Sequence, residues 1–171
     1  NGSEGIVRAA FDHARKHGRK KVTAVHKANV VRQTCGLFLE EARRVAAEYP
    51  DICFEDQNVD ATAMWLVKNP QSYDVIVTTN LFGDIISDLG AQLVGGLGFG
   101  SSGNIGDSYA VFEPTHGSAP KYAGQYKVNP LATLLAAKLM CEWLGETDRA
   151  GALEGAIATV IREGRVRTYD M

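Results

Sequence analysis

Helix-like and strand-like patterns alternate along this sequence, and the alternation limits its possible folds more than any other feature. Apolar residues have helical spacing over residues 3–18, 36–50 and 61–70. Strand character occurs between them and after them, over residues 21–27, 51–59 and 73–80. The last of these is a continuous apolar run, typical of a strand buried on both faces. Strands separated by helices predict an α/β fold with a substantially parallel sheet.

The second half continues the alternation less regularly. Further helices are expected over residues 81–96, 130–145 and 148–164, and a short strand over residues 108–114. Asn129 should cap the middle helix, and a glycine-rich loop should run to about residue 104. The sequence opens at a helix cap, Ser3, and stops at "RTYDM" without a terminating element. We therefore expect residues 1–171 to be a single α/β portion of a larger protein.

Composition excludes several classes of protein. The chain is 45% hydrophobic and 22% charged, which is the profile of a globular protein. A net charge of −2 without a dense Lys/Arg cluster indicates no binding of nucleic acid. No apolar run is long enough to span a membrane. Three widely spaced cysteines, and no apolar signal region in residues 1–20, favour a reducing compartment, and we expect a cytoplasmic protein.

One glycine motif is misleading. Residues 98–103, "GFGSSG", satisfy the GxGxxG pattern of dinucleotide-binding proteins. That fingerprint requires a strand before the glycines and a helix after them. Here a helix precedes the motif and none clearly follows it. A Rossmann fold is therefore not expected, and a functional loop is the better interpretation.

Three carboxylates are candidates for a metal site. Asp84 and Asp88 are four residues apart in a predicted helix just after a buried strand, so both lie on one helix face. Asp60 follows another strand. Three carboxylates near strand ends suit a hard cation such as Mg²⁺ or Mn²⁺. The alternatives are that Asp60 caps a helix and that Asp84 and Asp88 are solvated surface residues.

Two other regions hold polar residues of possible functional value. Lys27 ends a predicted strand, where a lysine near carboxylates can act as an acid or base; otherwise it is a solvent-facing lysine. Residues 113–130 are loop-like and contain His116, Lys121, Tyr122 and Asn129, which could contact a base, a ribose and a phosphate. His116 could also be an ordinary exposed histidine, and Asn129 only a helix cap.

Six motifs in fixed order resemble one enzyme family. They are "VTAVHKANV", "NVDATAM", "NLFGDIISDLGAQLVGGLG", "SGNIGD", "FEPTHGSAPKYAGQYKVNP" and "RTYD". Together they are similar to the metal-dependent β-decarboxylating dehydrogenases that act on isocitrate, isopropylmalate and homoisocitrate. The resemblance implies that family's own α/β fold, which is not a Rossmann fold, and it covers the second half of a chain about twice as long.

The resemblance implies roles for individual residues. Lys27 matches the catalytic lysine, and Asn29 lies near substrate and nicotinamide. Asp84 and Asp88 match two metal ligands. Asp60 matches a third, which in this family comes from the partner subunit, as does the lysine. A homodimer with shared active sites and bound Mg²⁺ or Mn²⁺ is therefore expected, with a small-molecule substrate.

The cofactor loop implies NADP. His116, Gly117 and Asn129 match the adenosine-binding loop. NAD-specific relatives typically carry an acidic and then an apolar residue where Lys121 and Tyr122 stand, and Tyr169 matches a second tyrosine of the NADP type. A cation and hydroxyl groups favour the 2′-phosphate of NADP, whereas a carboxylate there favours NAD.

The implied reaction is oxidation and decarboxylation of a 2-hydroxy acid. "HKANV", with "CGLF" after it, is closer to the isocitrate and homoisocitrate branches, because isopropylmalate enzymes usually carry an acid where His26 stands. The expected substrate is isocitrate, with 2-oxoglutarate as product, and isopropylmalate and homoisocitrate are the alternatives. Cys35 departs from the family, where an acidic residue is common. A non-catalytic regulatory subunit is a further alternative, although Lys27 and the three aspartates are retained. The substrate arginines and the catalytic tyrosine belong to the missing half, so this portion alone should be inactive.

Overall fold

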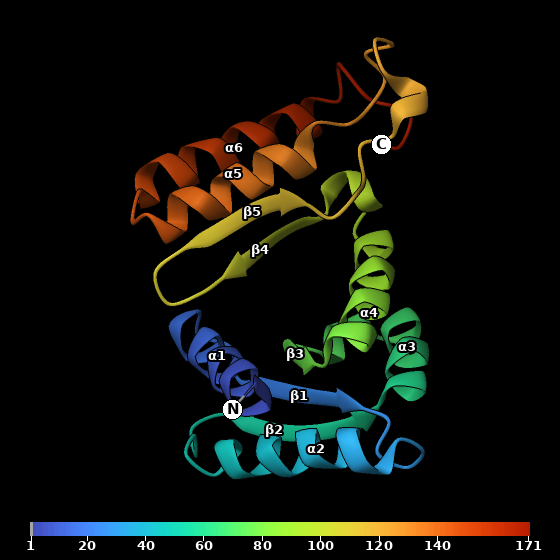
Figure 1. The fold of residues 1–171 in the computed structure, drawn as a ribbon. Coiled ribbons are helices and arrows are strands. Elements are labelled where there is room, and N and C mark those ends of the chain that lie inside the picture. Colours follow the sequence, from blue (N-terminus) through green and yellow to red (C-terminus); the bar gives the residue numbers. More distant parts are fainter. Residues whose placement is uncertain (1) are drawn as a thin grey trace. The chain divides into compact units, whose positions relative to one another are not determined.

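The structure is a computed structural model that describes residues 2–171. Its contacts group into two compact units, Asn1–Leu89 and Gly90–Met171 (Figure 1). The sequence patterns had indicated one undivided portion. The boundary falls inside a helix rather than in a Pro/Gly-rich linker, so composition gave no sign of it.

The first unit is an α/β layer structure built around three parallel strands. Its elements are α1 (Gly2–Lys16), β1 (Lys21–His26), α2 (Arg32–Ala46), β2 (Cys53–Asn58), α3 (Val59–Lys68), the 3₁₀ turn Pro70–Ser72, β3 (Val75–Thr78) and the start of α4 (Asn80–Leu93). The strands lie in the order β2-β1-β3, with β1 parallel to both neighbours (Figure 1). The predicted α/β fold with a parallel sheet is confirmed.

The core of this unit lies between one face of the sheet and two amphipathic helices. α1 contributes Phe11 and α2 contributes Phe38, and both are fully buried against Val22 of β1. The Phe11 ring stacks on Tyr49 with centroids 4.8 Å apart. α3 covers the opposite face, where Thr62 donates a hydrogen bond to Gln57 of β2 at 3.0 Å.

The strand order determines where a ligand site can form. α2 leads from β1 to β2 at one edge, and α3 leads from β2 across β1 to β3 at the other. Right-handed crossovers in opposite directions place α2 and α3 on opposite faces. Open α/β sheets bind ligands beyond the carboxyl ends of their strands, where the order reverses, here between β1 and β3. Lys27 follows β1 and Asn80 follows β3 at this edge.

The second unit packs two helices on a β-hairpin. Its elements are the end of α4, the 3₁₀ turn Leu97–Phe99, β4 (Ser101–Ile105), β5 (Ala110–Pro114), the 3₁₀ turn Pro120–Tyr122, α5 (Leu131–Trp143) and α6 (Thr147–Glu163). β4 and β5 are antiparallel, and the ring of Phe112 meets that of Trp143 on α5. α5 packs against α6, and Lys138 of α5 bridges to Glu154 of α6 at 3.4 Å.

Several local predictions were wrong. The glycine-rich loop contains β4, because pairing with β5 overrides the low strand propensity of its glycine and serines. β3 is short and lies at the edge of the described sheet, so of its residues only Val77 is buried. α1 begins at Gly2, so Ser3 lies in its first turn instead of capping it.

A cluster of ion pairs on the first unit predicts a pH-dependent stability. Hydrogen bonds from Arg44 and Arg8 lower the pKa of Glu4 below its ordinary 4.5. A lowered folded-state pKa stabilises the fold above the unfolded-state value and loses that effect as pH falls through the folded-state value. Glu4→Gln should therefore lower the melting temperature slightly at pH 7, and the gap should close below about pH 4. Glu40→Gln, at an exposed site of α2 without an ion pair among the described residues, is the control. A gap for Glu4→Gln that stays constant from pH 7 to pH 3 would contradict the assignment.

Candidate active site

Lys27 and Asp60 meet at the carboxyl edge of the sheet. Lys27 comes directly after β1, and Asp60 lies in the first turn of α3, just after the neighbouring β2. The Lys27 ammonium donates a hydrogen bond to the Asp60 carboxylate at 2.5 Å. This bond is the main cause that lowers the pKa of Asp60. Asn58, not Asp60, precedes α3, so the capping alternative for Asp60 is wrong.

Asp84 and Asp88 lie where the sequence predicted them. Both are on α4, one turn apart, and both are exposed. Neither forms an ion pair with any residue in the described range 2–171. Across that range, no three acidic, histidine or cysteine side chains form a group able to hold a metal ion. Asp60 therefore does not complete a three-carboxylate site with Asp84 and Asp88 within this chain.

These carboxylates nevertheless fit a divalent cation in their chemistry. Carboxylate oxygens are the ligands that Mg²⁺ and Mn²⁺ prefer, and Mg²⁺ is usually held by one or two of them with water and substrate completing the shell. Asp84 and Asp88 supply two such groups on one helix face. Like charges at this spacing repel, and a cation between them would remove that cost.

His26 and Asn29 flank the lysine. His26 is buried in β1, and both of its ring nitrogens are hydrogen-bonded. Asn29 lies exposed in the turn after Lys27, on the same edge of the sheet. Its expected place near substrate and nicotinamide stays a prediction.

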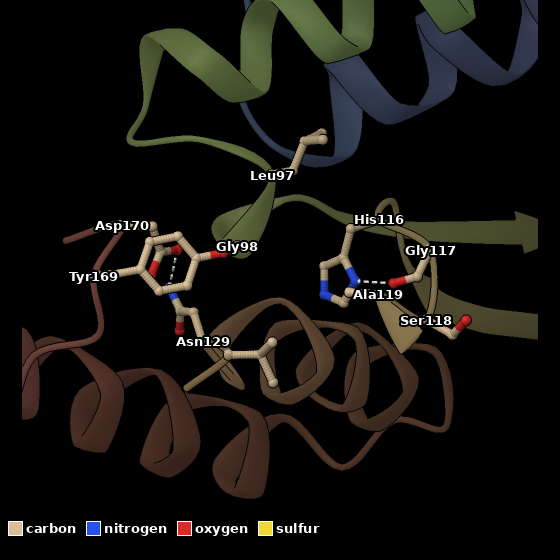
Figure 2. Close-up of a pocket in the computed structure, with 10 residues that line it drawn as sticks. Leu97, Gly98, His116, Gly117, Ser118, Ala119, Asn129, Tyr169 and Asp170 are labelled. Carbon is tan, nitrogen blue, oxygen red and sulfur yellow. Dashed lines mark hydrogen bonds between the residues drawn. The ribbon is translucent and has the colours of Figure 1, made fainter. Parts of the chain in front are cut away.

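A pocket of about 500 Å³ opens in the second unit. It is lined by Leu97, Gly98, His116, Gly117, Ser118, Ala119, Val128, Asn129, Tyr169 and Asp170. Figure 2 shows the Tyr169 ring beside Asn129 on one side and the His116 imidazole on the other. The sequence had selected four of these residues, from segments more than 50 positions apart. The volume lies in the range of small-molecule and cofactor sites.

Two polar side chains in this pocket keep hydrogen-bonding capacity for a ligand. The Nδ1–H of His116 donates to the carbonyl of Gly117 at 2.8 Å, which leaves Nε2 as an acceptor in the neutral ring (Figure 2). Asn129 is buried; its Oδ1 accepts from the Leu131 N–H at 3.0 Å, and its Nδ2 donates to Asp170 at 3.1 Å. The N-cap position of α5 is Pro130, so the predicted cap at Asn129 was one residue too early, although its side chain does bind the first N–H of the helix. The second Nδ2–H of Asn129 has no hydrogen-bond partner among the described residues and remains able to donate.

The three residues expected to read the cofactor phosphate lie together. The rings of Tyr122 and Tyr169 are 5.9 Å apart, and the Lys121 ammonium lies 4.8 Å from the centre of the Tyr122 ring. Tyr122 lines a second pocket that shares Ser118, Ala119 and Val128 with the first. Desolvation, followed by the neighbouring Tyr122, raises the pKa of Tyr169 above its ordinary 10. This phenol is protonated at neutral pH with or without the shift and can donate a hydrogen bond.

Sequence reasoning missed Gly98 and Asp170. Gly98 packs under the pair formed by Asn129 and Asp170, where an added Cβ would lie 2.3 Å from Asp170 Oδ2 and 2.8 Å from Asn129 Nδ2. The stretch "GFGSSG" contains this glycine, but it drew attention only as a dinucleotide-binding fingerprint, which was rejected. The only sequence signal for Asp170 was the "RTYD" motif. Its hydrogen-bonding partner, Asn129, lies 41 positions away in the sequence.

Gly98→Ala is expected to destabilise the second unit. The added methyl group must push the Asn129–Asp170 pair apart, and overpacking of this kind costs about 1–3 kcal/mol. Gly117→Ala is the matched control, because its Cβ would meet no atom within 4 Å. Urea unfolding of both variants measures the difference. Equal stability of the two variants would show that Gly98 is not needed for close packing.

Comparison with known proteins identifies the family. The whole chain, residues 1–171, matches the family described as isocitrate/isopropylmalate dehydrogenase. This chain belongs to that family. The 3-isopropylmalate dehydrogenase of Archaeoglobus fulgidus is 51% identical over 99% of this chain and 52% of its own length. The isocitrate dehydrogenase [NADP] of Thermus thermophilus is 49% identical over 99% of this chain and 34% of its own.

A solved structure confirms the fold. The isocitrate dehydrogenase from Methylococcus capsulatus is 54% identical and superposes with a TM-score of 0.97, over 99% of this chain and 50% of that one. The chain thus has the isocitrate/isopropylmalate dehydrogenase fold and spans about half the length of most relatives it matches. The names of relatives divide between substrates and between NAD and NADP. No described helix is long and apolar enough to cross a membrane.

Proposed function

We propose that this chain is the half of a decarboxylating dehydrogenase that carries its catalytic lysine, metal ligands and cofactor loop. The supporting observation is the Lys27–Asp60 pair at the carboxyl edge of the sheet, beside the helix that presents Asp84 and Asp88. The reaction is the conversion of isocitrate and NADP⁺ to 2-oxoglutarate, CO₂ and NADPH. Isopropylmalate and homoisocitrate are the alternative substrates.

Each side chain then has a defined task. Asp60 holds the Lys27 ammonium in place until substrate binds. Once Lys27 has released its proton, its neutral Nζ accepts the proton of the substrate hydroxyl as hydride passes to the nicotinamide. Asp84 and Asp88 hold the divalent cation, with the partner's copy of Asp60 completing the set. When bound, the cation stabilises the negative charge that develops on the substrate oxygen during oxidation and loss of CO₂.

The active site is proposed to be shared between two copies of the chain. Within this chain Asp60 pairs with Lys27 and does not join Asp84 and Asp88 in the described residues. An arrangement in which one subunit supplies Lys27 and Asp60 and the other supplies Asp84 and Asp88 satisfies both observations. The sequence places α4 near this interface through Ile86, Leu89 and Leu93. Ile86 is buried within the chain and Leu93 is 41% exposed, whereas Leu81 and Ile85 are 66% and 55% exposed. These two residues are the better candidates for contact.

The alternative from another class is a non-catalytic regulatory subunit. Such a subunit has no use for a base at the carboxyl edge or for unpaired carboxylates on α4. Lys27 is in hydrogen-bonding contact with Asp60, and Asp84 and Asp88 carry no ion pair in residues 2–171. These features favour a catalytic chain.

A cofactor exchange tests the NADP preference. Lys121→Asp with Tyr122→Ile should lower kcat/KM for NADP at least tenfold while sparing or improving NAD. The reason is that the change removes a cation and a phenol beside Tyr169 and adds a charge that repels the 2′-phosphate. A charge-assisted hydrogen bond contributes about 1.5–3 kcal/mol, or about ten- to a hundredfold in affinity.

The control for this exchange is Lys127→Asp. It makes the same charge change in the same loop, at an exposed lysine that, unlike Lys121, does not lie over the Tyr122 ring. Its NADP to NAD ratio should stay within about twofold of wild type. A wild-type full-length enzyme that used NAD better than NADP would contradict the proposed reading of the loop.

The substrate assignment is tested directly with the full-length enzyme. NADPH formation would be measured with isocitrate, isopropylmalate and homoisocitrate under identical Mg²⁺ and cofactor conditions. The highest kcat/KM is expected with isocitrate. A higher kcat/KM with either of the other two acids would show that isocitrate is the wrong substrate, while the oxidative decarboxylation itself would stand. No turnover with any of the three acids would favour a regulatory chain.

A further inference from the structure

We propose that His26 is a positioning residue that fixes the backbone from which Lys27 projects. The inference rests on the proposed function of Lys27 and adds a residue to it. His26 is the last residue of β1 and is 5% exposed, and it has no assigned part in the reaction. A buried imidazole next to a catalytic lysine needs a physical explanation of its own.

The hydrogen bonds of His26 define its tautomer. Its Nδ1 accepts from the backbone N–H of Ala28 at 3.0 Å, so Nδ1 carries no proton. The proton therefore lies on Nε2, which faces the Asp56 carboxylate at 3.3 Å. Arg43 of α2 holds the other oxygen of Asp56 at 2.9 Å. The ring is thereby anchored through β2 to α2, which packs on the same face of the sheet.

The bond to Ala28 acts on one particular peptide group. The Lys27–Ala28 peptide has its carbonyl oxygen on Lys27 and its N–H on Ala28. The carbonyl accepts from Val30 N–H at 3.0 Å and from Val31 N–H at 2.8 Å. The N–H donates to His26. Both ends of the peptide plane are therefore held, which restricts ψ of Lys27 and φ of Ala28.

This restriction sets the direction of the Lys27 side chain. Lys27 is the first residue past the strand, so the sheet ladder no longer constrains it. Beyond the strand, the hydrogen bonds of the turn and of His26 constrain the backbone of Lys27 instead. A misplacement of about 1 Å at a catalytic group can cost about 10²-fold in rate. Loss of the His26 contact should therefore lower kcat more than it changes substrate binding.

A matched pair of substitutions in the full-length enzyme tests the role. Asn places its side-chain oxygen near the position of Nδ1, so His26→Asn keeps an acceptor for Ala28. Gln places its amide near Nε2, so His26→Gln keeps the contact to Asp56 and loses the acceptor. We expect His26→Gln to lower kcat by about 10- to 100-fold with KM for isocitrate within about threefold. His26→Asn should recover most of that loss.

A purely structural histidine would give a different result. The two variants would then lower the melting temperature without a difference in kcat, or a folded His26→Gln would keep kcat within about twofold of wild type. Either outcome overturns the inference. If His26→Gln does not fold, Asp56→Asn tests the same inference, because it changes the partly exposed carboxylate that faces His26. It should lower kcat several-fold with KM unchanged, and an unchanged kcat would overturn the inference as well.

Lys27→Met separates this inference from the proposed function. An active Lys27→Met enzyme would remove the base that His26 is proposed to position, and both would fail. If Lys27→Met is inactive while His26→Gln is folded and fully active, only the role of His26 is wrong. The expected pattern is an inactive Lys27→Met, a slow His26→Gln and a nearly normal His26→Asn.

Discussion

Asp84→Asn in the full-length enzyme is expected to lower kcat/KM for isocitrate by at least about 10²- to 10³-fold, equivalent to several kcal/mol of transition-state stabilisation. Asp84 is exposed on α4, one turn from Asp88, so the exchange removes a charged ligand without disturbing the core. The amide keeps the size of the side chain and one oxygen but loses the negative charge that attracts the cation. The apparent affinity for Mg²⁺ or Mn²⁺ should fall in parallel.

The control is Asp148→Asn, in the first turn of α6, which makes the same chemical change at a residue that belongs to neither candidate site. It should leave kcat/KM and metal affinity near wild type. Excess chelator should abolish the wild-type activity, and added Mg²⁺ or Mn²⁺ should restore it. Activity that persists in chelator would refute the metal assignment.

Lys27→Met chains should be inactive alone but should regain activity in mixed dimers. The partner chain in the mixture would carry a defective substrate arginine in its first half. If Lys27 serves the neighbouring active site, each mixed dimer contains one site with both an intact lysine and an intact arginine. Random mixing should then restore about a quarter of the wild-type activity, because about half of the dimers are mixed and half of their sites are complete.

Mixed dimers must be verified independently, for example by two affinity tags used in sequence. Purified mixed dimers without activity would contradict the shared site, although Lys27 could still act within its own chain. Activity in the Lys27→Met homodimer would contradict the catalytic role of the lysine itself.

The parallel part of the fold was predictable because local pattern and tertiary structure agree there. β1 is β-branched, it is buried, and helices with clear apolar faces flank it. Where local pattern and tertiary structure differ, prediction failed. β4 is "SSGNI", which has no strand character of its own and forms because β5 pairs with it. The division at Leu89 lies inside α4, a helix with an uninterrupted pattern.

The candidate sites were predictable where a motif keeps its residues close in sequence. Asp84 and Asp88 lie one turn apart on α4, as their spacing predicted. Lys27 and Asp60 were each predicted just after a strand, but their contact depends on β1 and β2 being neighbours, which was not predicted. Long-range contacts carried no comparable signal. Nothing in the local sequence connects His26 to Arg43 through Asp56, or Asn129 to Asp170. These contacts depend on register and packing, which the sequence patterns do not specify.

The most direct measurement is the release of CO₂ for each NADPH formed by the purified full-length enzyme with isocitrate and Mg²⁺. It would be made on wild type and on a folded Lys27→Met variant. We expect one CO₂ per NADPH in wild type and no measurable release of either product in the variant. NADPH without CO₂ would contradict the decarboxylation, and an unchanged Lys27→Met enzyme would contradict the active site described for this chain.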